Sequence, residues 1–341
     1  MTLPSRNEQL QLAELAGRAP SPHNIQPARW RFTEGQAGGK IELHECTRRW
    51  LRVGDPSGRD NQIALGAAWE GMCLALSEHG YGVSEVNPLD GSPIPPDTVE
   101  HRLIASADLC ACENVDLLAP YVRDRKSFRG VFLSANEAQR QLLAGLAGNS
   151  GFALGIVEPA AIKQIATWYD QAAALGLHDP LFVRELYSWM RFSASDPDWS
   201  RDGLSTECMG LSPLESFAAR FALKPMVVRG LSALKLESVL VSEAAKVNSA
   251  AMLMLLYAPV NESAFVTGRK FYRFWLQLTS AGFCGVPMSA LADSAAHAAR
   301  LVASHPLPSG QHLVNVMRVG PQPSKPIARS ARLPAAELLL P

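Results

Sequence analysis

The chain has 341 residues, of which 47% are apolar and 19% charged, and its 32 basic side chains balance 32 acidic ones. A chain this apolar is not intrinsically disordered, and a net charge of zero without a basic stripe argues against electrostatic binding to nucleic acid. No signal peptide is visible, and the most apolar stretch, 250–260, has about half the residues that a membrane span needs. We therefore expect a cytoplasmic protein without nucleic-acid or membrane partners.

The predicted elements mix helices and strands along the whole chain. Periodicity and capping residues predict helices over 8–17, 63–79, 136–147, 160–174, 180–192, 242–248 and 268–281. Apolar runs and alternation predict strands over 29–33, 41–44, 83–86, 103–111, 153–157, 251–258 and 312–319. Residues 196–235 combine turn signals with apolar side chains and show no regular period, so we predict a lid, with bounds 180–235.

Cysteine and histidine spacing argues against several kinds of metal or redox site. The six cysteines form no CxxC pair, and the eight histidines form no HExxH motif. We therefore interpret the cysteines as free thiols of a reducing compartment and expect no protein-built metal site.

Two stretches of the chain resemble each other. Gly66 precedes Gly80 by fourteen residues across an apolar helical segment, and Gly268 precedes Gly282 by the same spacing across another. A weaker match pairs LAELAG at 12–17 with LAGLAG at 143–148, in the same order. These matches predict a duplicated α+β unit with halves 1–119 and 120–341. The alternative is that two amphipathic helices look alike by chance.

The segment 16–32 contains a stiff polar turn after the first predicted helix. Between Pro20 and Pro27 it carries four side chains that form hydrogen bonds, Ser21, His23, Asn24 and Gln26. Because the prolines restrict the backbone, such a turn could hold the polar edge of a planar heterocycle. An ordinary capped turn remains the alternative.

Two basic segments could bind a phosphate group. In the segment 121–132, cations surround a serine: Arg123, Arg125, Lys126 and Arg129 flank Ser127. The segment 318–334 ends in an extended tail with Arg329, Ser330 and Arg332. Arginine forks and a hydroxyl suit a terminal phosphate, whereas a solvated helix end and a disordered basic tail are the alternatives.

Taken together, these motifs resemble the nitroreductase superfamily of flavin-binding proteins. The motifs APSPHNIQP, RKSFR, GVPMSA and the ARSARLP tail occur in this order, and GDPSGRDNQIALGAAWEGMCLAL resembles the Acg-like subgroup. The resemblance implies an α+β nitroreductase-like fold in which two pseudo-symmetric halves have central antiparallel or mixed sheets surrounded by helices. In that subgroup both halves are fused in one chain.

The resemblance also implies FMN as cofactor and assigns site residues by position. Its phosphate contacts fall on Arg125, Ser127, Arg129, Arg329, Ser330 and Arg332. Its contacts to the flavin ring and ribityl chain fall on Ser21, Asn24, Gln26, Arg191, Pro287, Met288, Ser289 and Ala290. Its catalytic positions are His23, which faces the substrate in relatives, and Ser289. The second half lacks a polar turn and the first lacks a clamp, which implies a fused, monomeric pseudo-dimer with one FMN per chain.

The expected function is that of an FMN-dependent oxidoreductase. NAD(P)H would reduce the flavin at N5, and a small nitroaromatic or quinone-like compound would take the electrons. The alternative is an FMN storage or sequestration protein with a closed lid and little turnover. A third possibility, a partner protein that binds no flavin, fits poorly with the retained phosphate cations.

Overall fold

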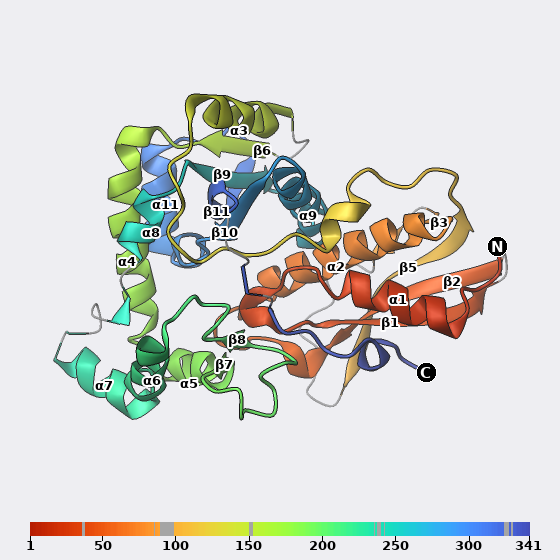
Figure 1. Ribbon diagram of the computed structural model, residues 1–341, viewed down its shortest axis with the longest axis horizontal. Helices are drawn as coiled ribbons and strands as arrows, with labels where there is room; N and C mark the ends of the chain where they lie inside the picture. The colour runs from red at the N-terminus through yellow and green to blue at the C-terminus, as the bar shows by residue number, and fades with distance from the viewer. Residues whose placement is uncertain are drawn as a thin grey trace.

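The computed structural model describes residues 1–35, 38–84, 86–88, 99–149, 153–234, 236, 240–241, 243–323, 327–328 and 330–341 (Figure 1). The elements up to residue 111 are α1 (Arg6–Ala16), β1 (Ala28–Gly35), β2 (Gly38–Cys46), α2 (Arg59–Glu78), β3 (Tyr81–Val83), β4 (Asn87–Pro88) and β5 (His101–Ala111). Those from residue 137 to 233 are α3 (Glu137–Asn149), β6 (Ala153–Ile156), α4 (Ile162–Gly176), α5 (Pro180–Ser188), β7 (Met190–Arg191), β8 (Leu204–Ser205), α6 (Pro213–Ala222) and α7 (Pro225–Ala233). The remaining ones are α8 (Ala244–Asn248), β9 (Met252–Pro259), α9 (Ala264–Ser280), β10 (Phe283–Pro287), α10 (Ala290–Asp293), α11 (Ala295–Ser304) and β11 (Gln311–Pro321).

Two antiparallel sheets are assembled in the same way. The first has the strand order β1-β2-β5-β3, with β4 added against β5, and the second has the order β6-β9-β11-β10. In each sheet a long helix, α2 or α9, connects the second strand in the chain to an edge strand, and the last strand returns to the interior. The mixture of helices and antiparallel sheets confirms the expected α+β class.

The helices α2 and α9 pack against each other between the two sheets (Figure 1). A Cβ atom at Gly66 would overlap the carbonyl oxygen of Phe265, and one at Gly268 would overlap that of Ile63. The two contacts are reciprocal, because Gly268 and Phe265 each follow Gly66 and Ile63 by 202 residues. Only glycine allows the helices to approach this closely, which explains two of the four repeated glycines.

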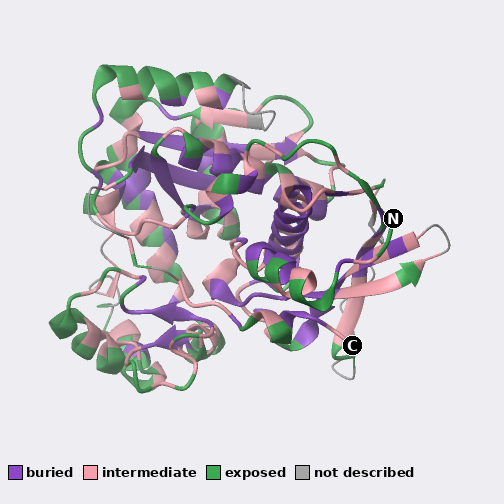
Figure 2. Cartoon of the chain, turned by 45° about the vertical axis from the view of Figure 1, so that its right-hand side comes forward, coloured by how far each residue is buried: buried purple, intermediate pink, exposed green. Residues whose placement is uncertain are grey.

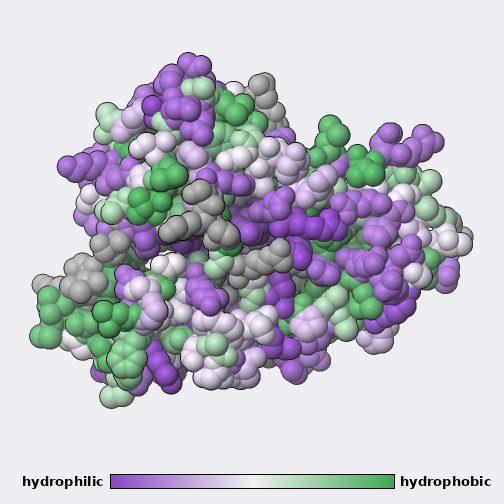
Figure 3. Space-filling view, in the orientation of Figure 1, coloured by the Kyte–Doolittle hydropathy of each residue, from purple (hydrophilic) through white to green (hydrophobic). Residues whose placement is uncertain are grey.

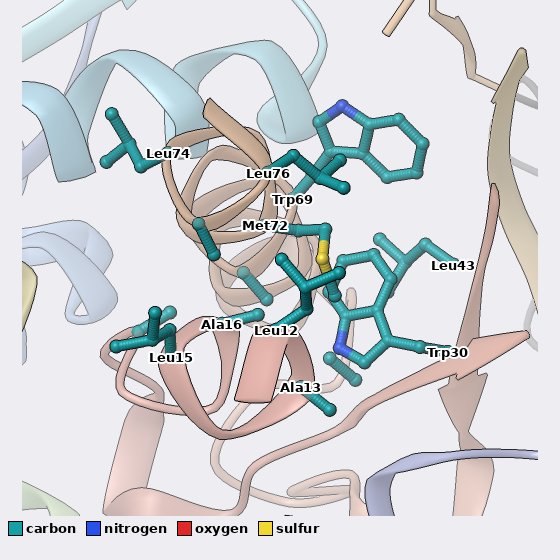
Figure 4. Packing of buried hydrophobic residues seen from close by; sticks show 14 of the residues in the cluster. Leu12, Ala13, Leu15, Ala16, Trp30, Leu43, Trp69, Met72, Leu74 and Leu76 are labelled. Carbon is teal, nitrogen blue, oxygen red and sulfur yellow. The ribbon is translucent and has the colours of Figure 1, made fainter. Parts of the chain in front are cut away.

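The core around the first sheet is built from α1, α2 and the strands. The helix α1 starts at a capping box, in which the Ser5 hydroxyl and the Glu8 carboxylate cap each other's backbone. Its apolar face, including Leu12, lies against Met72 of α2 and Trp30 of β1 (Figure 4). The rings of Trp30 and Trp69 lie 5.9 Å apart. Buried residues concentrate in such strands and in the central helices (Figure 2).

The last residues of the chain cross over to the first sheet. The Leu340 amide donates to the Trp30 carbonyl at 2.7 Å, and Leu338 belongs to the core formed by α1 and α2. The C-terminal segment therefore lies beside the polar turn that follows α1.

The lid is more regular than its sequence suggested. The prediction of irregular structure over 196–235 was wrong in part, because α6 and α7 lie there. Each begins with a proline in its first turn, and α6 also has a capping box between Ser212 and Glu215. The helix predicted over 180–192 instead ends at Ser188, and the chain continues as β7, which pairs in parallel with β8.

Other predicted elements differ mainly at their ends. The helix predicted from residue 268 begins at Ala264, where the Ser263 hydroxyl accepts from the Val266 amide. The short helices α10 and α11 were not predicted. Residue 242, the predicted start of another helix, lies outside the described residues. Within the described residues, every helix is too short or too polar to cross a lipid bilayer.

Candidate functional site

The polar turn after α1 has a strained backbone. His23, Asn24 and Gln26 have φ angles of 44°, 57° and 50°, in the left-handed region that residues other than glycine rarely adopt. The Ser21 hydroxyl accepts a hydrogen bond of 3.0 Å from the Gln26 amide across the turn. Strain of this kind is retained when the surroundings fix it, and it concentrates at functional sites.

The turn is bound to the lid through its side-chain amides. The Asn24 Nδ2 atom donates to the Gly203 carbonyl at 3.3 Å, and the Gln26 Nε2 atom donates to the Arg201 carbonyl at 2.8 Å. Both amides are buried. The lid therefore packs directly on the turn predicted to touch the flavin.

The same two amides bind the C-terminal tail. The Asn24 Nδ2 atom also donates to the Ala331 carbonyl at 2.9 Å, and the Gln26 Oε1 atom accepts from the Leu333 amide at 2.9 Å. A guanidinium nitrogen of Arg332 donates to Asn24 Oδ1 at 2.9 Å. The first half and the tail thus meet at this turn, as the predicted site requires.

Two predicted phosphate ligands converge beside the turn. Arg125 and Arg332 both donate to the carbonyl oxygen of Arg18, at 3.1 and 3.2 Å. The Arg125 guanidinium also lies 4.6 Å from the ring centre of Trp275 on α9. Among the described residues, neither arginine forms an ion pair with a carboxylate.

Several donors of this cluster are buried without a partner. They are Nε and Nη1 of Arg125, Nε of Arg332 and Nε of Arg18. Burial lowers the pKa of Arg125, and burial together with the charge of Arg125 lowers the pKa of Arg332 to about 9. Burying two cations side by side costs free energy unless an anion joins them. A phosphate group, with charge and acceptor oxygens, fits this donor set.

His23 has a neutral side chain at neutral pH. Its Nδ1 atom is buried without a hydrogen-bond partner. Burial, with a smaller contribution from the charge of Arg129, lowers the pKa of His23 to about 4. If His23 is catalytic, it therefore acts as a neutral imidazole and does not supply a charged proton donor at pH 7.

The RKSFR segment lies along the strand that leads into the predicted flavin segment. Ser127 forms a parallel bridge to Gly285 of β10, and the Phe128 amide donates to the Gly285 carbonyl at 3.3 Å. The strand β10 then continues into Pro287 and Met288. This pairing explains how the clamp segment, far from β10 in the chain, comes beside it.

Only part of the segment Pro287–Ala290 can donate a backbone hydrogen bond to a ligand. Pro287 has no amide hydrogen, and the Met288 amide donates to the Val316 carbonyl at 2.7 Å. Within the described residues, the amides of Ser289 and Ala290 make no backbone hydrogen bond. A donor to flavin N5 would therefore come from Ser289 or Ala290.

Arg191 forms an ion pair within the lid. Its guanidinium donates to Asp202 at 2.6 Å, and Asp202 also pairs with Arg49 at 3.0 Å. Arg49 in turn donates to the carbonyl of Ile25, next to the polar turn. This chain of buried ion pairs, which we call the Asp202 latch, fastens the lid to the first half.

The remaining predicted ligands lie at the edge of the site or cannot be placed. Arg129 donates to the Cys208 carbonyl of the lid at 3.4 Å. Ser330 is described, but no hydrogen bond of its side chain is found among the described residues, and Arg329 lies outside them.

The sequence did not predict the roles of Arg18 and Trp275. Arg18 contributes a backbone carbonyl and Trp275 an aromatic face, and neither leaves a motif in the sequence.

No known protein-family profile matches the chain. It is similar to two Mycobacterium tuberculosis proteins, from strains CDC 1551 and H37Rv, each named "Putative NAD(P)H nitroreductase". Each is 29% identical over 177 residues, covering 51% of this chain and 48% of the relative. The match thus spans about half the length of these curated relatives.

Solved nitroreductase structures are also similar to the chain. A "putative nitroreductase" from Anabaena variabilis is 9% identical and covers 95% of this chain and 90% of its own, with a TM-score of 0.49. The FMN-dependent nitroreductase NfnB from Mycobacterium smegmatis, in complex with NADPH, is 16% identical and covers 62% of this chain and 92% of its own, with a TM-score of 0.36.

Proposed function

We propose that the protein is an FMN-dependent oxidoreductase of the nitroreductase type, which uses NAD(P)H to reduce small nitroaromatic or quinone-like compounds through flavin N5. The observation that carries this proposal is the convergence of Arg125 and Arg332 on one carbonyl oxygen, with buried donors left unpaired. The similarity to proteins named as NAD(P)H nitroreductases supports the same reaction class.

The chain's own residues would bind FMN from two sides. Arg125 and Arg332 would hold the phosphate, with Ser127, Arg129 and the Arg329 tail position adding donors around it. The turn at Ser21, Asn24 and Gln26 would border the ring, and the segment Pro287–Ala290 would pass over its central part. Asn24 and Gln26 would keep one or more of their present hydrogen bonds to the tail, so their role would be to position the turn.

We also infer that the chain is a fusion of two nitroreductase-like halves of the Acg-like kind, 1–119 and 120–341. The shared strand order of the two sheets and the reciprocal contacts of Gly66 and Gly268 support this inference. Contacts in which two equivalent positions exchange partners are the signature of a twofold interface. The site would then combine the clamp of one half with the turn of the other.

Bound FMN would supply the redox chemistry, by accepting a hydride from NAD(P)H and passing electrons to an oxidised substrate. The protein would bind and orient the flavin and the substrate, and it would exclude water from them. His23, neutral at pH 7, would present an uncharged ring to the substrate. The amide of Ser289 or Ala290 would stabilise negative charge that develops at N5.

Storage of FMN is the second candidate function, and the Asp202 latch favours it. The lid is held by buried ion pairs and by hydrogen bonds from Asn24 and Gln26, so it closes over the predicted ring site. Rapid mixing with NADH or NADPH separates the two functions. Bleaching of the oxidised flavin absorbance within seconds supports an enzyme, whereas bleaching by dithionite alone supports storage.

Affinity measurements on arginine variants test the phosphate site. Each charge-assisted hydrogen bond contributes about 1.5–3 kcal/mol, so Arg125→Ala and Arg332→Ala should each weaken FMN binding about tenfold or more. Arg123→Ala is the matched control, because Arg123 is exposed and pairs with Glu78. Fluorescence titration of the apoprotein with FMN measures all three. Unchanged affinity in both site variants would place the phosphate elsewhere.

A further inference from the structure

The outer face of α6 and α7 exposes an unusual amount of apolar surface. Leu214, Phe217 and Phe221 follow one face of α6 at helical spacing, and Phe217 is 64% exposed. Met226, at the start of α7, is 88% exposed. Hydrophobic residues gather over these two helices at the lower left of Figure 3. Large exposed apolar patches mark binding surfaces.

Other side chains of this segment pack against the rest of the lid. Val228 of α7 is buried against Val183 of α5, and Leu223, just after α6, packs on the lid cluster around Met190. Val228 and Leu223 therefore hold the two helices against the rest of the lid, while Leu214, Phe217, Phe221 and Met226 stay exposed. We call the exposed set Leu214, Phe217, Phe221 and Met226 the lid patch.

The segment that carries the lid patch has a net positive charge, although the whole chain is neutral. Over 213–234 the cations are Arg220, Lys224 and Arg229, and the carboxylate is Glu215. The three cations are exposed, and none of them pairs with a described carboxylate. The Glu215 carboxylate is held by the Ser212 amide at 2.7 Å. Lys224 lies with Nζ 4.9 Å from the centre of the Phe221 ring, so cation and aromatic ring are presented together.

We propose that the lid patch binds the surface of an anionic lipid bilayer. Short amphipathic helices with aromatic and aliphatic residues on one face and cations beside them lie in the interface plane of such membranes. With 10 and 9 residues, α6 and α7 are too short to span a bilayer and suit this position. The expectation of no membrane partner rested on the length of apolar stretches, which does not bear on binding at the bilayer surface.

A second copy of the chain fits the patch less well. In a twofold contact, Arg220, Lys224 and Arg229 of the two copies would approach one another, and like charges across an interface repel. Anionic headgroups instead neutralise these cations while the acyl region takes the apolar side chains. The proposal is independent of the flavin site.

Co-sedimentation of the full chain with vesicles tests the proposal. The protein should bind vesicles of phosphatidylcholine with about one third phosphatidylserine, bind phosphatidylcholine alone more weakly, and dissociate as salt rises. Phe217→Ser and Met226→Ser should each weaken binding about tenfold, and Lys224→Glu about fivefold or more. Leu117→Ser is the apolar control, because Leu117 is also 88% exposed, and Arg6→Glu is the charge control on α1.

Two results would overturn the proposal. One is binding that stays equal in all five variants, which would assign the vesicle contact to another surface. The other is no vesicle binding together with a dimer, seen by analytical ultracentrifugation, that dissociates in Phe217→Ser. That second outcome would identify a copy of the chain as the occupant of the lid patch.

Discussion

Several buried side chains beside the polar turn have polar atoms without a hydrogen-bond partner. Arg125 and Arg332 are adjacent cations, and His23 is a base with an unpaired ring nitrogen near Arg129. The two arginines would be better placed with an anion beside them, whereas the neutral His23 ring lacks only a hydrogen-bond partner. These unpaired groups cost the protein free energy, which the proposed phosphate would offset for the arginines.

The burial of His23 leads to a prediction about how the stability of the protein depends on pH. With a pKa of about 4 in the fold and about 6.5 when unfolded, the unfolded state binds more protons between these values. Stability of the apoprotein should therefore rise with pH from about 4 to 6.5, and His23→Asn should reduce this rise by about 2 kcal/mol. Asparagine suits the position because it tolerates a positive φ.

Urea unfolding of both proteins across this pH range measures the difference. Nuclear magnetic resonance of the ring protons gives the midpoint independently. A His23 midpoint near 6.5, or parallel stability curves, would show that the ring is solvated.

Short motifs in the sequence selected residues that the structure brings together, but they did not predict the contacts of these residues. Arg125, Arg332, Asn24 and Gln26 were all selected from short motifs, and the structure brings them together. Their partners could not be predicted, because they are backbone carbonyls of Arg18, Arg201 and Gly203. A carbonyl carries no sequence signal, and its position depends on how distant segments pack.

At the scale of elements, the α2–α9 pair holds the two sheets together. Gly66 and Gly268 let each helix touch the other's first turn. Gly66→Ala should lower the free energy of unfolding by about 3 kcal/mol or more, because the new methyl group would overlap backbone. Gly145→Ala, in α3 where nothing lies within 4 Å of the added Cβ, should stabilise by about 1 kcal/mol or less. Equal unfolding midpoints for the two variants in urea would refute this account.

The Asp202 latch makes a separate prediction about the lid. Asp202→Asn removes the carboxylate shared by the buried Arg191 and the half-buried Arg49. Among the described carboxylates, Arg191 is then left with only the more distant Asp196, at 3.9 Å. Hydrogen exchange over 189–211 should accelerate about a hundredfold, while the two sheets keep their protection. Asp198→Asn is the control, since Asp198 is partly exposed and its ion pair within the described part of the chain is with Arg201. The latch would have no role if both variants exchanged at the wild-type rate.

Most elements were predictable, because periodicity and caps are local. The strands around 103–111 and 312–319, and the helix beginning near residue 63, were predicted close to their observed ranges. The lid helices were not, because α6 and α7 are only 10 and 9 residues long and each begins in a turn signal, LSPL or LKP, which favours a loop.

At the scale of the whole molecule, two similar sheets carry different parts of the proposed site. Two sheets of one strand order surround a reciprocal helix pair, yet the arginine clamp lies in the second half and the polar turn in the first. The tail that carries Arg332 crosses to the first half, where Leu338 and Leu340 anchor it. We therefore predict one complete site per chain.

The number of flavins bound per chain tests this central claim most directly. Apoprotein saturated with FMN, freed of excess ligand and denatured, should release one FMN for each chain, as measured from flavin absorbance against protein concentration. Arg125→Ala should release far less under the same conditions. Two flavins per chain, or none, would contradict a single site assembled from both halves.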